Sequence, residues 1–375
     1  MGAGVTVAVL GGGPAGLAAS IQGAQQGLSV TLFEKNKVGE NIKCAEGFYD
    51  SMKLFGPPSH GALFKVDCLH IKVKDEYKVD CSNVNLWMID RQTWQKGLKE
   101  EAMALGVDVK ENCPVNPTDL VSISQNYDWV IDCTGIPSTT SISKGFSHVY
   151  KNYWAYAHQI TLFGNFQNQL GELKVGVSPD YLGYYWIFPK SKDFANVGLG
   201  IFPQNNKYPE TLKKRLKREL HNIIHREGLQ NCKKVRKTGG VIPTKPLDEL
   251  VFDNIILAGD SGGFSSPLHG GGIDLALFTG KEAINAINEG EIDNYRQRLL
   301  DKAGAKLEIE QKIFDLWEQI GYENLDRLLR LILKREAVFE LPRLFQFRDL
   351  LISERQTITA FYDGFFQGNW DRISY

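Results

Sequence analysis

The first 35 residues contain the arrangement that most restricts how this chain can fold. Val5–Leu10 is a short apolar run rich in β-branched residues, which is typical of a buried parallel strand. The segment 11–16 has the pattern G-x-G-x-x-G, and residues 17–26 have the composition of a helix. A second apolar run, Ser29–Phe33, ends at the acidic residue Glu34. Strand, glycine turn, helix, strand and acid in this order predict a dinucleotide-binding βαβ unit.

Each glycine of this motif has its own physical role. Gly11 permits the tight turn after the strand, Gly13 lets the backbone approach a pyrophosphate, and Gly16 lets the helix pack on the strand. The free N–H groups and the partial positive charge of the helix N-terminus favour phosphate. Glu34 can accept hydrogen bonds from ribose hydroxyls. The expected nucleotide contacts of this unit are Gly11, Gly13, Pro14, Ala15, Gly16, Glu34 and Lys35.

A second glycine-rich segment indicates which dinucleotide is bound. The apolar run 254–258 ends at Gly259 and Asp260, and further glycines precede a helix expected over 272–288. A carboxylate at this place can hold ribityl hydroxyls, and the positive end of the helix favours an anionic reduced flavin. The segment therefore favours FAD over NAD as the cofactor. The expected contacts here are Gly259, Asp260, Gly271, Gly272 and Ile273.

The combination of these two segments resembles the flavoprotein hydroxylase superfamily. Asp132–Gly135 follows the apolar run Trp129–Ile131 and is similar to the segment that returns the chain to the nucleotide in that superfamily. Ile89–Arg91 is similar to its Asp-Arg segment, whose arginine lies beside FAD, although an arginine here also suits a surface helix. The resemblance adds Arg91, Thr134 and Gly135 to the expected FAD contacts.

Two further segments resemble the geranylgeranyl reductase family, which reduces isolated prenyl double bonds. Lys43–Gly47 is similar to the cysteine-containing turn near the flavin of that family, although Ala45 stands where glycine is usual. Tyr184–Lys190 is similar to its Y-x-W-x-F-P segment, which lines the substrate cavity. Asp260–Gly263 differs from the Asp-Ala-Ala-His sequence frequent in the hydroxylases, which favours the reductase branch.

The aromatic run also has a direct physical interpretation. Alternation at Tyr184, Trp186 and Phe188 places three rings on one face of a strand. Such a face suits a prenyl chain or a flat ring, and it is also typical of an ordinary hydrophobic core. The family resemblance favours the cavity. The expected substrate-cavity residues are Tyr184, Trp186, Phe188, Pro189, Pro267 and His269.

Reduction of an unactivated C=C bond requires a hydride from the flavin and a proton from a well-placed acid. An ordinary thiol has a pKa of about 8.5 and is mostly protonated at neutral pH. Cys44, which the resemblance places beside the flavin, is the expected proton donor, and burial for packing is the alternative. Glu46 is expected to hold Cys44 or a water molecule, and Tyr184 is a second candidate donor.

The positions of these motifs predict an α/β fold with a discontinuous Rossmann-like FAD-binding domain, since distant segments contact one cofactor. We expect this domain to comprise residues 1–70, 90–144 and 236–300. An inserted β-sheet substrate domain is expected over 71–89 and 145–235, and a C-terminal helical region over 301–375.

Composition excludes several classes of function. The formal net charge of -1 gives no overall attraction to nucleic acid. Six cysteines without a C-x-x-C pair indicate a reducing compartment rather than a zinc site or a disulfide framework, and the histidines lack metal-ligand spacing. No apolar stretch approaches the roughly 20 residues of a membrane-spanning helix. We therefore expect a cytoplasmic protein without a metal site or a nucleic-acid partner.

Two regions suggest surface partners. Glu210–Glu227 predicts a basic helix, which suits phosphate headgroups or an acidic electron-transfer protein and is equally typical of a solvated helix face. Cations and aromatic residues near 334–345 suit peripheral membrane contact or packing against the FAD domain. No separate NAD(P)H site is visible, so NAD(P)H and a ferredoxin-type protein both stay open as electron donors.

The main interpretation is an FAD-dependent reductase of C=C bonds in a prenyl or other apolar substrate. The alternatives are a flavin-dependent monooxygenase acting on an aromatic compound and a flavoprotein that acts on a small metabolite or peptide. A flavin-bearing sensor without turnover is a further alternative.

Overall fold

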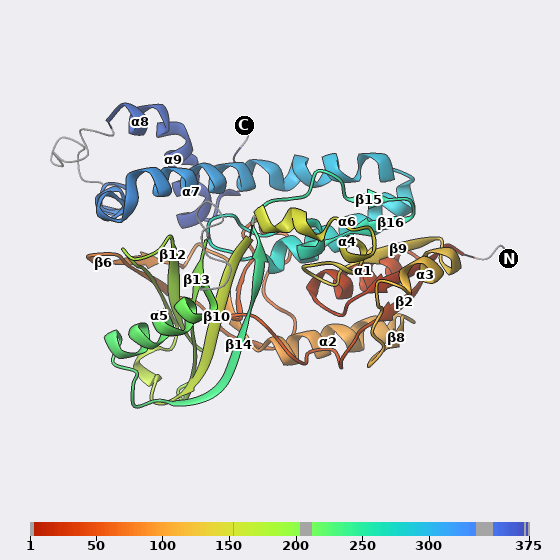
Figure 1. Ribbon diagram of the computed structural model, residues 1–375, viewed down its shortest axis with the longest axis horizontal. Coiled ribbons are helices and arrows are strands. Elements are labelled where there is room, and N and C mark those ends of the chain that lie inside the picture. The colour runs from red at the N-terminus through yellow and green to blue at the C-terminus, as the bar shows by residue number, and fades with distance from the viewer. Residues whose placement is uncertain (1–3, 153, 203–211, 335–347, 371–372, 374–375) are drawn as a thin grey trace.

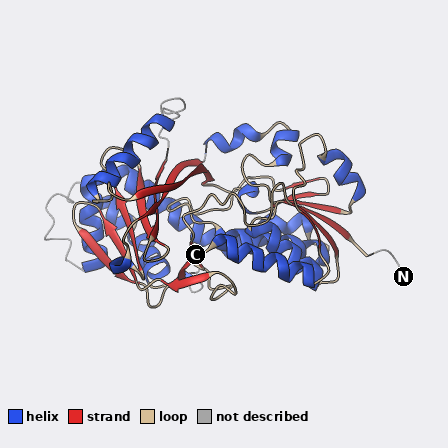
Figure 2. Ribbon diagram, turned by 90° about the horizontal axis from the view of Figure 1, so that it is seen from below, coloured by secondary structure: helices blue, strands red, loops and turns tan. Residues whose placement is uncertain are grey.

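The computed structural model describes residues 4–152, 154–202, 212–334, 348–370 and 373. Two halves built on separate β-sheets lie side by side, and a long helix runs across both (Figures 1 and 2). The predicted fold class is confirmed: a Rossmann-type α/β unit, a second β-sheet unit and a C-terminal helical region are all present.

The first half contains a six-stranded sheet with the nucleotide-binding topology. Its order is β15 (Val251–Phe252), β16 (Ile255–Leu257), β9 (Trp129–Asp132), β1 (Thr6–Leu10), β2 (Ser29–Phe33) and β8 (Asp108–Lys110). β1 pairs in parallel with β2 and β9, so the carboxyl ends of these strands meet at one edge. A site at that edge is the usual outcome of this topology.

Helices α1 (Pro14–Gln25), α2 (Arg91–Ala104) and α6 (Ile273–Glu289) accompany this sheet. α1 begins three residues before the expected start because Pro14, with its fixed φ, suits the first helical position. α1 and α6 pack closely, since a Cβ at Gly280 would lie only 2.1 Å from the carbonyl oxygen of Ala15. Short helices α3 (Leu120–Asn126) and α4 (Thr139–Ser143) flank β9, with 3₁₀ turns at Ser147–Asn152 and Gly259–Gly262.

The second half contains a seven-stranded sheet. Its order is β14 (Lys233–Pro243), β10 (Trp154–Phe163), β13 (Phe194–Ile201), β12 (Gly183–Pro189), β11 (Glu172–Val177), β5 (Cys68–Lys72) and β6 (Glu76–Asp80). A 3₁₀ turn at Gln167–Gln169 lies between β10 and β11. Helix α5 (Leu212–Arg226) covers one face, where its Leu216 and Leu220 pack with Tyr185 and Ile187 of β12. The alternate residues of the same strands point to the opposite face of the sheet.

A small three-stranded sheet that the sequence did not suggest lies between the halves. It consists of β3 (Gly47–Tyr49), β7 (Leu86–Ile89) and β4 (Ala62–Lys65). The strands of the large sheet also extend beyond the expected ranges, because β5 begins at Cys68 and β14 continues to Pro243. Where these strands begin and end depends on pairing between segments that are distant in the chain, and local composition does not show such pairing.

The C-terminal helices connect the two halves. Helix α7 (Tyr295–Lys334) follows the 3₁₀ turn Ile292–Asn294 and bends sharply at Gly321, whose φ and ψ are 69° and 176°. Its Leu299 packs in the core of the FAD-binding half, whereas Ile313 packs against the large sheet. α8 (Arg348–Ser353), α9 (Arg355–Phe361) and a π-helical turn (Tyr362–Phe366) complete the region.

Membrane contact was suggested for a segment that lies mostly outside the described residues, at 335–347. Among the helices that the structure does describe, none combines the length and the apolar character that crossing a bilayer requires.

Candidate functional site

A cavity of about 1890 Å³ lies where the two halves meet. The glycine-rich turn after β1, the carboxyl end of β2 and the N-terminus of α6 line it on one side. The inner face of the large sheet and the helices α7 and α9 line it on the other. The cavity brings together most of the residues expected from the sequence: Gly11, Gly13, Pro14, Ala15, Glu34, Lys35, Cys44, Glu46, Arg91, Thr134, Gly135, Tyr184, Trp186, Phe188, Asp260, His269, Gly271, Gly272 and Ile273.

Four expected residues do not line the cavity. Gly16 and Gly259 have packing roles, since a Cβ would lie 1.9 Å from the Gly11 oxygen at the first and 3.0 Å from the Ala15 Cβ at the second. Pro189 is buried and shares the strand parity of Tyr185 and Ile187, so it faces away from the cavity. Pro267 is a buried residue of the loop before α6. The packing role that the motif predicted for Gly16 is therefore confirmed, and the expectation of direct ligand contact is corrected for the other three residues.

The N-terminus of α1 has the form of an anion site. Gly13 is the N-cap residue, and no side chain caps the helix there. An added Cβ at Gly13 would have no heavy atom within 4 Å, so the backbone faces open space in the cavity. Uncapped N–H groups at a helix N-terminus attract phosphate oxygens. This place fits the pyrophosphate of a dinucleotide.

The N-terminus of α6 opens into the same cavity. Its N-cap residue, Gly272, also lacks a side-chain cap. Asp260 lies close by, and burial raises the pKa of its carboxyl to about 6, although the positive charge of Arg91 opposes the shift. A carboxylate that burial has deprived of water favours hydroxyl groups as hydrogen-bond partners. The second helix N-terminus and Asp260 therefore fit the ribityl and flavin part of FAD.

Glu34 and Arg91 lie on either side of the glycine turn. The carboxylate of Glu34 accepts hydrogen bonds from the N–H groups of Gly12 at 2.7 Å and Asn36 at 2.9 Å. Arg91, the first residue of α2, donates from Nε to Gln95 Oε1 at 3.0 Å, and Gln95 Nε2 donates to the Gly12 carbonyl oxygen at 3.0 Å. Gln95 therefore joins Arg91 to the phosphate-binding turn. No motif in the sequence had indicated this glutamine.

Asp132 organises the loop that returns to the cofactor. It is fully buried at the end of β9 and accepts hydrogen bonds from the Oγ1 atoms of Thr134 and Thr140, both at 2.6 Å. The backbone N–H groups of the same two threonines donate to it at 3.0 and 2.7 Å. Thr134 and Gly135 are thereby presented to the cavity, whereas Asp132 itself is enclosed.

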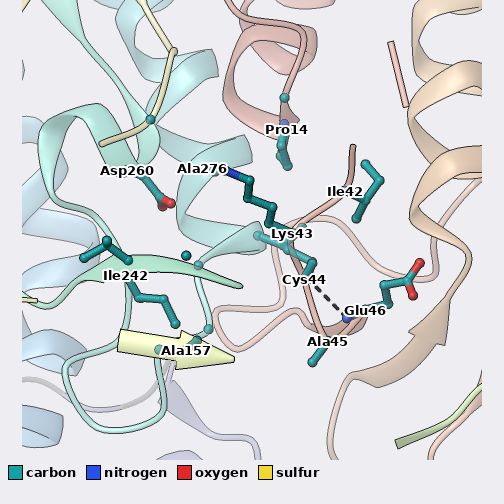
Figure 3. A pocket seen from close by; sticks show the side chains of 18 of the residues that line it. Pro14, Ile42, Lys43, Cys44, Ala45, Glu46, Ala157, Ile242, Asp260 and Ala276 are labelled. Carbon is teal, nitrogen blue, oxygen red and sulfur yellow. Dashed lines mark hydrogen bonds between the residues drawn. The ribbon is translucent and has the colours of Figure 1, made fainter. Parts of the chain in front are cut away.

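The turn 44–46 lies beside the flavin end of the cavity (Figure 3). The N–H of Glu46 donates to Cys44 Sγ at 3.2 Å. The side chain of Glu46, which was expected to hold Cys44 or a water, instead binds Lys190 Nζ at 2.8 Å and Asn196 Nδ2 at 2.7 Å. This expectation is corrected, because the ammonium and the amide hold the carboxylate on the far side of the turn from the thiol.

Lys43 is a cavity residue to which no motif had assigned a role. Its side chain extends into the cavity toward Asp260 and Pro14 (Figure 3). A cation there lies near both anion-binding helix N-termini. Its position next to Cys44 could have indicated this role, because neighbouring residues of one turn can line the same cavity.

The three alternating rings of β12 face the cavity as the strand period predicts. Tyr184, Trp186 and Phe188 all line it, while Tyr185 packs under α5. The Tyr184 hydroxyl donates to the carbonyl oxygen of His269, and burial raises its pKa. A hydroxyl committed to a backbone carbonyl and made less acidic by burial is a poor proton donor. Tyr184 is therefore a weaker donor candidate than Cys44.

Beyond the rings, the cavity continues as an apolar section. Its walls come from the large sheet and the C-terminal helices, and they include Ile71, Val79, Val175, Ile313, Leu329 and Phe361. The bend at Gly321 directs the second part of α7 over this section, so Leu325 and Leu328 also line it. An apolar space lined in this way accommodates a hydrocarbon chain.

A basic group lies at another edge of the cavity. Lys213 and Lys217 of α5 and Lys237 of β14 line it around His158. Burial, together with the positive charges of the three lysines, lowers the pKa of His158. Within the described part of the chain, none of these lysines forms an ion pair with a carboxylate. The group therefore attracts anions.

Comparisons with known proteins agree with this arrangement. Residues 155–242 match the family described as the geranylgeranyl reductase catalytic domain, and residues 6–58 match an FAD binding domain. The digeranylgeranylglycerophospholipid reductase of Methanosarcina acetivorans is 24% identical over 390 residues, covering 94% of each chain. The digeranylgeranylglycerophospholipid reductase 2 of Methanothermobacter thermautotrophicus is 28% identical over 360 residues, covering 86% of this chain and 90% of its own. These matches make the chain similar to geranylgeranyl reductases.

Solved structures show the same fold. A geranylgeranyl bacteriochlorophyll reductase-like protein of Thermoplasma acidophilum has a TM-score of 0.78 at 20% identity, covering 94% of this chain and 99% of its own. A flavin-dependent brominase has a TM-score of 0.61 at 15% identity, covering 87% of this chain and 93% of its own. The chain is an FAD-dependent enzyme, and the two uncapped helix N-termini, Asp260 and Arg91 are the features that fit its cofactor.

Proposed function

We propose that this enzyme saturates C=C bonds in the prenyl chain of a lipid. The observation that carries the proposal is the continuity of one cavity, in which the flavin end, the Cys44 turn and the apolar section are open to one another. The names of the relatives, which specify a digeranylgeranylglycerophospholipid, support a prenylated phospholipid as the substrate class. FAD in its reduced form supplies a hydride to such a bond.

The protein has to supply the proton and exclude water. In this proposal the Cys44 thiol donates the proton to the second carbon of the double bond, and the resulting thiolate accepts the N–H of Glu46, already 3.2 Å from the sulfur. Tyr184, Trp186 and Phe188 hold the chain against the flavin end and keep that region apolar. An apolar surrounding favours neutral reactants such as an alkene and a thiol.

The central test is anaerobic. The purified holoprotein is reduced with dithionite, so that the result does not depend on whether NAD(P)H or a ferredoxin is the donor. A geranylgeranyl-bearing phospholipid is then added, and flavin reoxidation is followed with mass analysis of the product. We expect reoxidation with a gain of two hydrogens per bond. Reoxidation only after oxygen is admitted, with a hydroxylated product, would replace the proposal with a monooxygenase.

Cys44→Ala tests the proton donor. We expect the rate of flavin reoxidation by substrate to fall on the order of 100-fold or more, the usual contribution of a positioned general acid. Bound FAD should be unchanged, because the thiol is not needed to hold the cofactor. Cys232→Ala is the matched control, since this cysteine lies just before β14, next to Gly164, and does not line the cavity. Full turnover in Cys44→Ala would remove the role assigned to the thiol.

The basic group is proposed to receive the anionic end of the substrate. We expect the double variant Lys213→Glu/Lys217→Glu to raise the KM for a phosphate-bearing geranylgeranyl lipid roughly 30-fold, since each of the two cations near a headgroup contributes about 1 kcal/mol. The KM for the neutral alcohol geranylgeraniol should not change. Lys214→Glu/Arg218→Glu makes the same charge change on the same helix away from the cavity lining and should leave both values unaltered. Equal effects of the two double variants would indicate only a general charge effect.

A further inference from the structure

The cysteine turn is held by side chains from the other half of the molecule. Along the chain, residues 44–46 belong to the FAD-binding half, yet their backbone carbonyls are bound by the large sheet. Gln159 Nε2 of β10 donates to the Cys44 carbonyl oxygen at 3.0 Å, and Asn196 Nδ2 of β13 donates to the Ala45 carbonyl oxygen at 3.1 Å. Gln159 is 5% exposed and Asn196 is 1% exposed, so water does not compete for either bond.

Gln159 is itself fixed by Trp186. The sheet register aligns Gln159 of β10, Gly198 of β13 and Trp186 of β12 in one row. A Cβ at Gly198 would lie 2.4 Å from the indole, so the absence of a side chain lets the ring cross β13. The indole Nε1 then donates to Gln159 Oε1 at 2.9 Å. Because the oxygen of the amide is engaged by the indole, its nitrogen must face the turn.

Asn196 is oriented in the same way, in the next row on the same face of the sheet. Thr161 of β10 and Phe188 of β12 flank it across the sheet. Thr161 Oγ1 donates to Asn196 Oδ1 at 2.9 Å, which directs the amide nitrogen to the Ala45 carbonyl and to Glu46 Oε2. Two successive rows on the same face of the sheet therefore present two oriented amide donors to consecutive carbonyls of one turn.

The turn needs this external support. Glu46 has a φ of 72°, in the left-handed region that non-glycine residues avoid. Its carboxylate is restrained by Lys190 and Asn196, and by the N–H of Arg91, which donates to Oε1 at 3.1 Å. Its N–H, directed by the same backbone angle, points at Cys44 Sγ. The geometry around the thiol therefore depends on contacts that the turn does not make by itself.

We propose that Gln159 and Asn196 are positioning residues that set the place of the Cys44 thiol, and that Trp186 acts through its N–H as well as through its ring. The inference rests on the proposed role of Cys44 as the proton donor. In this inference β12 has a second role, because Trp186 lines the substrate cavity and also orients Gln159, which binds the turn that carries Cys44.

A double-mutant cycle tests the connection between Trp186 and Gln159. Gln159→Leu removes both hydrogen bonds of the amide, and Trp186→Phe removes the indole N–H while keeping an aromatic ring. We expect each change to lower kcat on the order of tenfold, with KM for the prenyl lipid within about twofold for Gln159→Leu, since small misplacements of a reacting group have effects of this size. The double variant should be no slower than the slower single variant, because both changes break one chain of contacts.

The reactivity of the thiol provides a readout independent of turnover. The rate of Cys44 alkylation by iodoacetamide is measured against pH in the FAD-loaded protein, with tryptic mass analysis to identify the modified cysteine. Gln159→Leu and Asn196→Leu should shift this profile or raise the alkylation rate severalfold at constant flavin content. Gln169→Leu, the same change at an exposed site of the same half, should leave the profile unaltered.

The outcomes separate this inference from the proposed function. If Cys44→Ala abolishes turnover but Gln159→Leu leaves kcat and the alkylation profile at wild-type values, the positioning role is wrong and the proton donor stands. Additive losses in the double variant would also overturn the route through Trp186. If Cys44→Ala turns over normally, the proposed donor fails, and the alkylation profile still reports whether Gln159 sets the thiol.

Discussion

Gly16→Val is expected to yield a protein without bound FAD. Gly16 lies in the first turn of α1, and a Cβ there would lie 1.9 Å from the backbone oxygen of Gly11 and 3.3 Å from Val9 Cγ1. A backbone carbonyl cannot move aside as a flexible side chain can, so α1 must shift away from the glycine turn. The uncapped N–H groups that fit the pyrophosphate would shift with it.

The measurement is flavin content after purification, from the absorbance ratio of flavin to protein, together with far-UV circular dichroism. Gly4→Val is the control, because the same side chain there meets nothing within 4 Å. We expect stoichiometric FAD in the control and less than about a tenth in Gly16→Val, corresponding to at least 1.4 kcal/mol of lost binding free energy under the loading conditions. A flavin-replete Gly16→Val protein would show that the close contact is not required.

Lys306→Met is expected to destabilise the protein strongly. Lys306 and Glu310 face each other across one turn of α7, with Nζ 2.9 Å from Oε1, and their side chains are 3% and 0% exposed. His269 Nε2 lies 3.5 Å from the same carboxylate oxygen. Removing the ammonium leaves Glu310 buried without its main counter-ion, which typically reduces the free energy of unfolding by about 3–5 kcal/mol. Urea unfolding followed by tryptophan fluorescence measures this loss.

Two comparisons show whether the isolated charge is the cause. Lys306→Met/Glu310→Leu removes both charges and should recover much of the lost stability, because an apolar pair needs no counter-ion. Lys312→Met, on the same helix, faces the exposed Glu308 at 2.9 Å and should change the free energy of unfolding by no more than about 1 kcal/mol. A loss in Lys312→Met as large as in Lys306→Met would contradict the explanation.

Lys306, Glu310 and His269 also determine whether the free energy of unfolding rises or falls with pH. Burial would raise the pKa of Glu310, but the positive charges of Lys306 and His269 outweigh it and bring the pKa to about 2. A carboxyl whose pKa is lowered on folding stabilises the protein above its unfolded value of about 4.3 and loses that effect as the pH falls toward 2. The stability difference between wild type and Lys306→Met should therefore narrow over this acidic range.

The nucleotide half could be predicted from sequence because its signals are local. The strand, the glycine turn, the helix and Glu34 lie within one continuous segment, and each has its own steric or electrostatic requirement. The rings of β12 were also predictable, since strand parity alone decides which face they share. Parity also places Pro189 on the opposite face, although the motif had suggested the cavity.

The contacts around Cys44 could not be predicted in this way. Gln159 and Asn196 lie more than 100 residues from the turn they bind. Their role depends on the register of three strands, which the sequence alone does not determine. The Lys306–Glu310–His269 group could not be predicted for a related reason, because the burial of its charges depends on how α7 packs against the loop that carries His269.

The way the cysteine turn is held limits how this enzyme can be recombined with its relatives. Exchange of the FAD-binding half at a boundary along the chain would transfer residues 44–46 without the amides of β10 and β13 that bind them. The unit that has to be inherited together is therefore a turn from one half and two strands from the other. A library of chimeras would keep the hydrogen bonds of this turn only when its crossovers respect that spatial unit rather than the domain boundary.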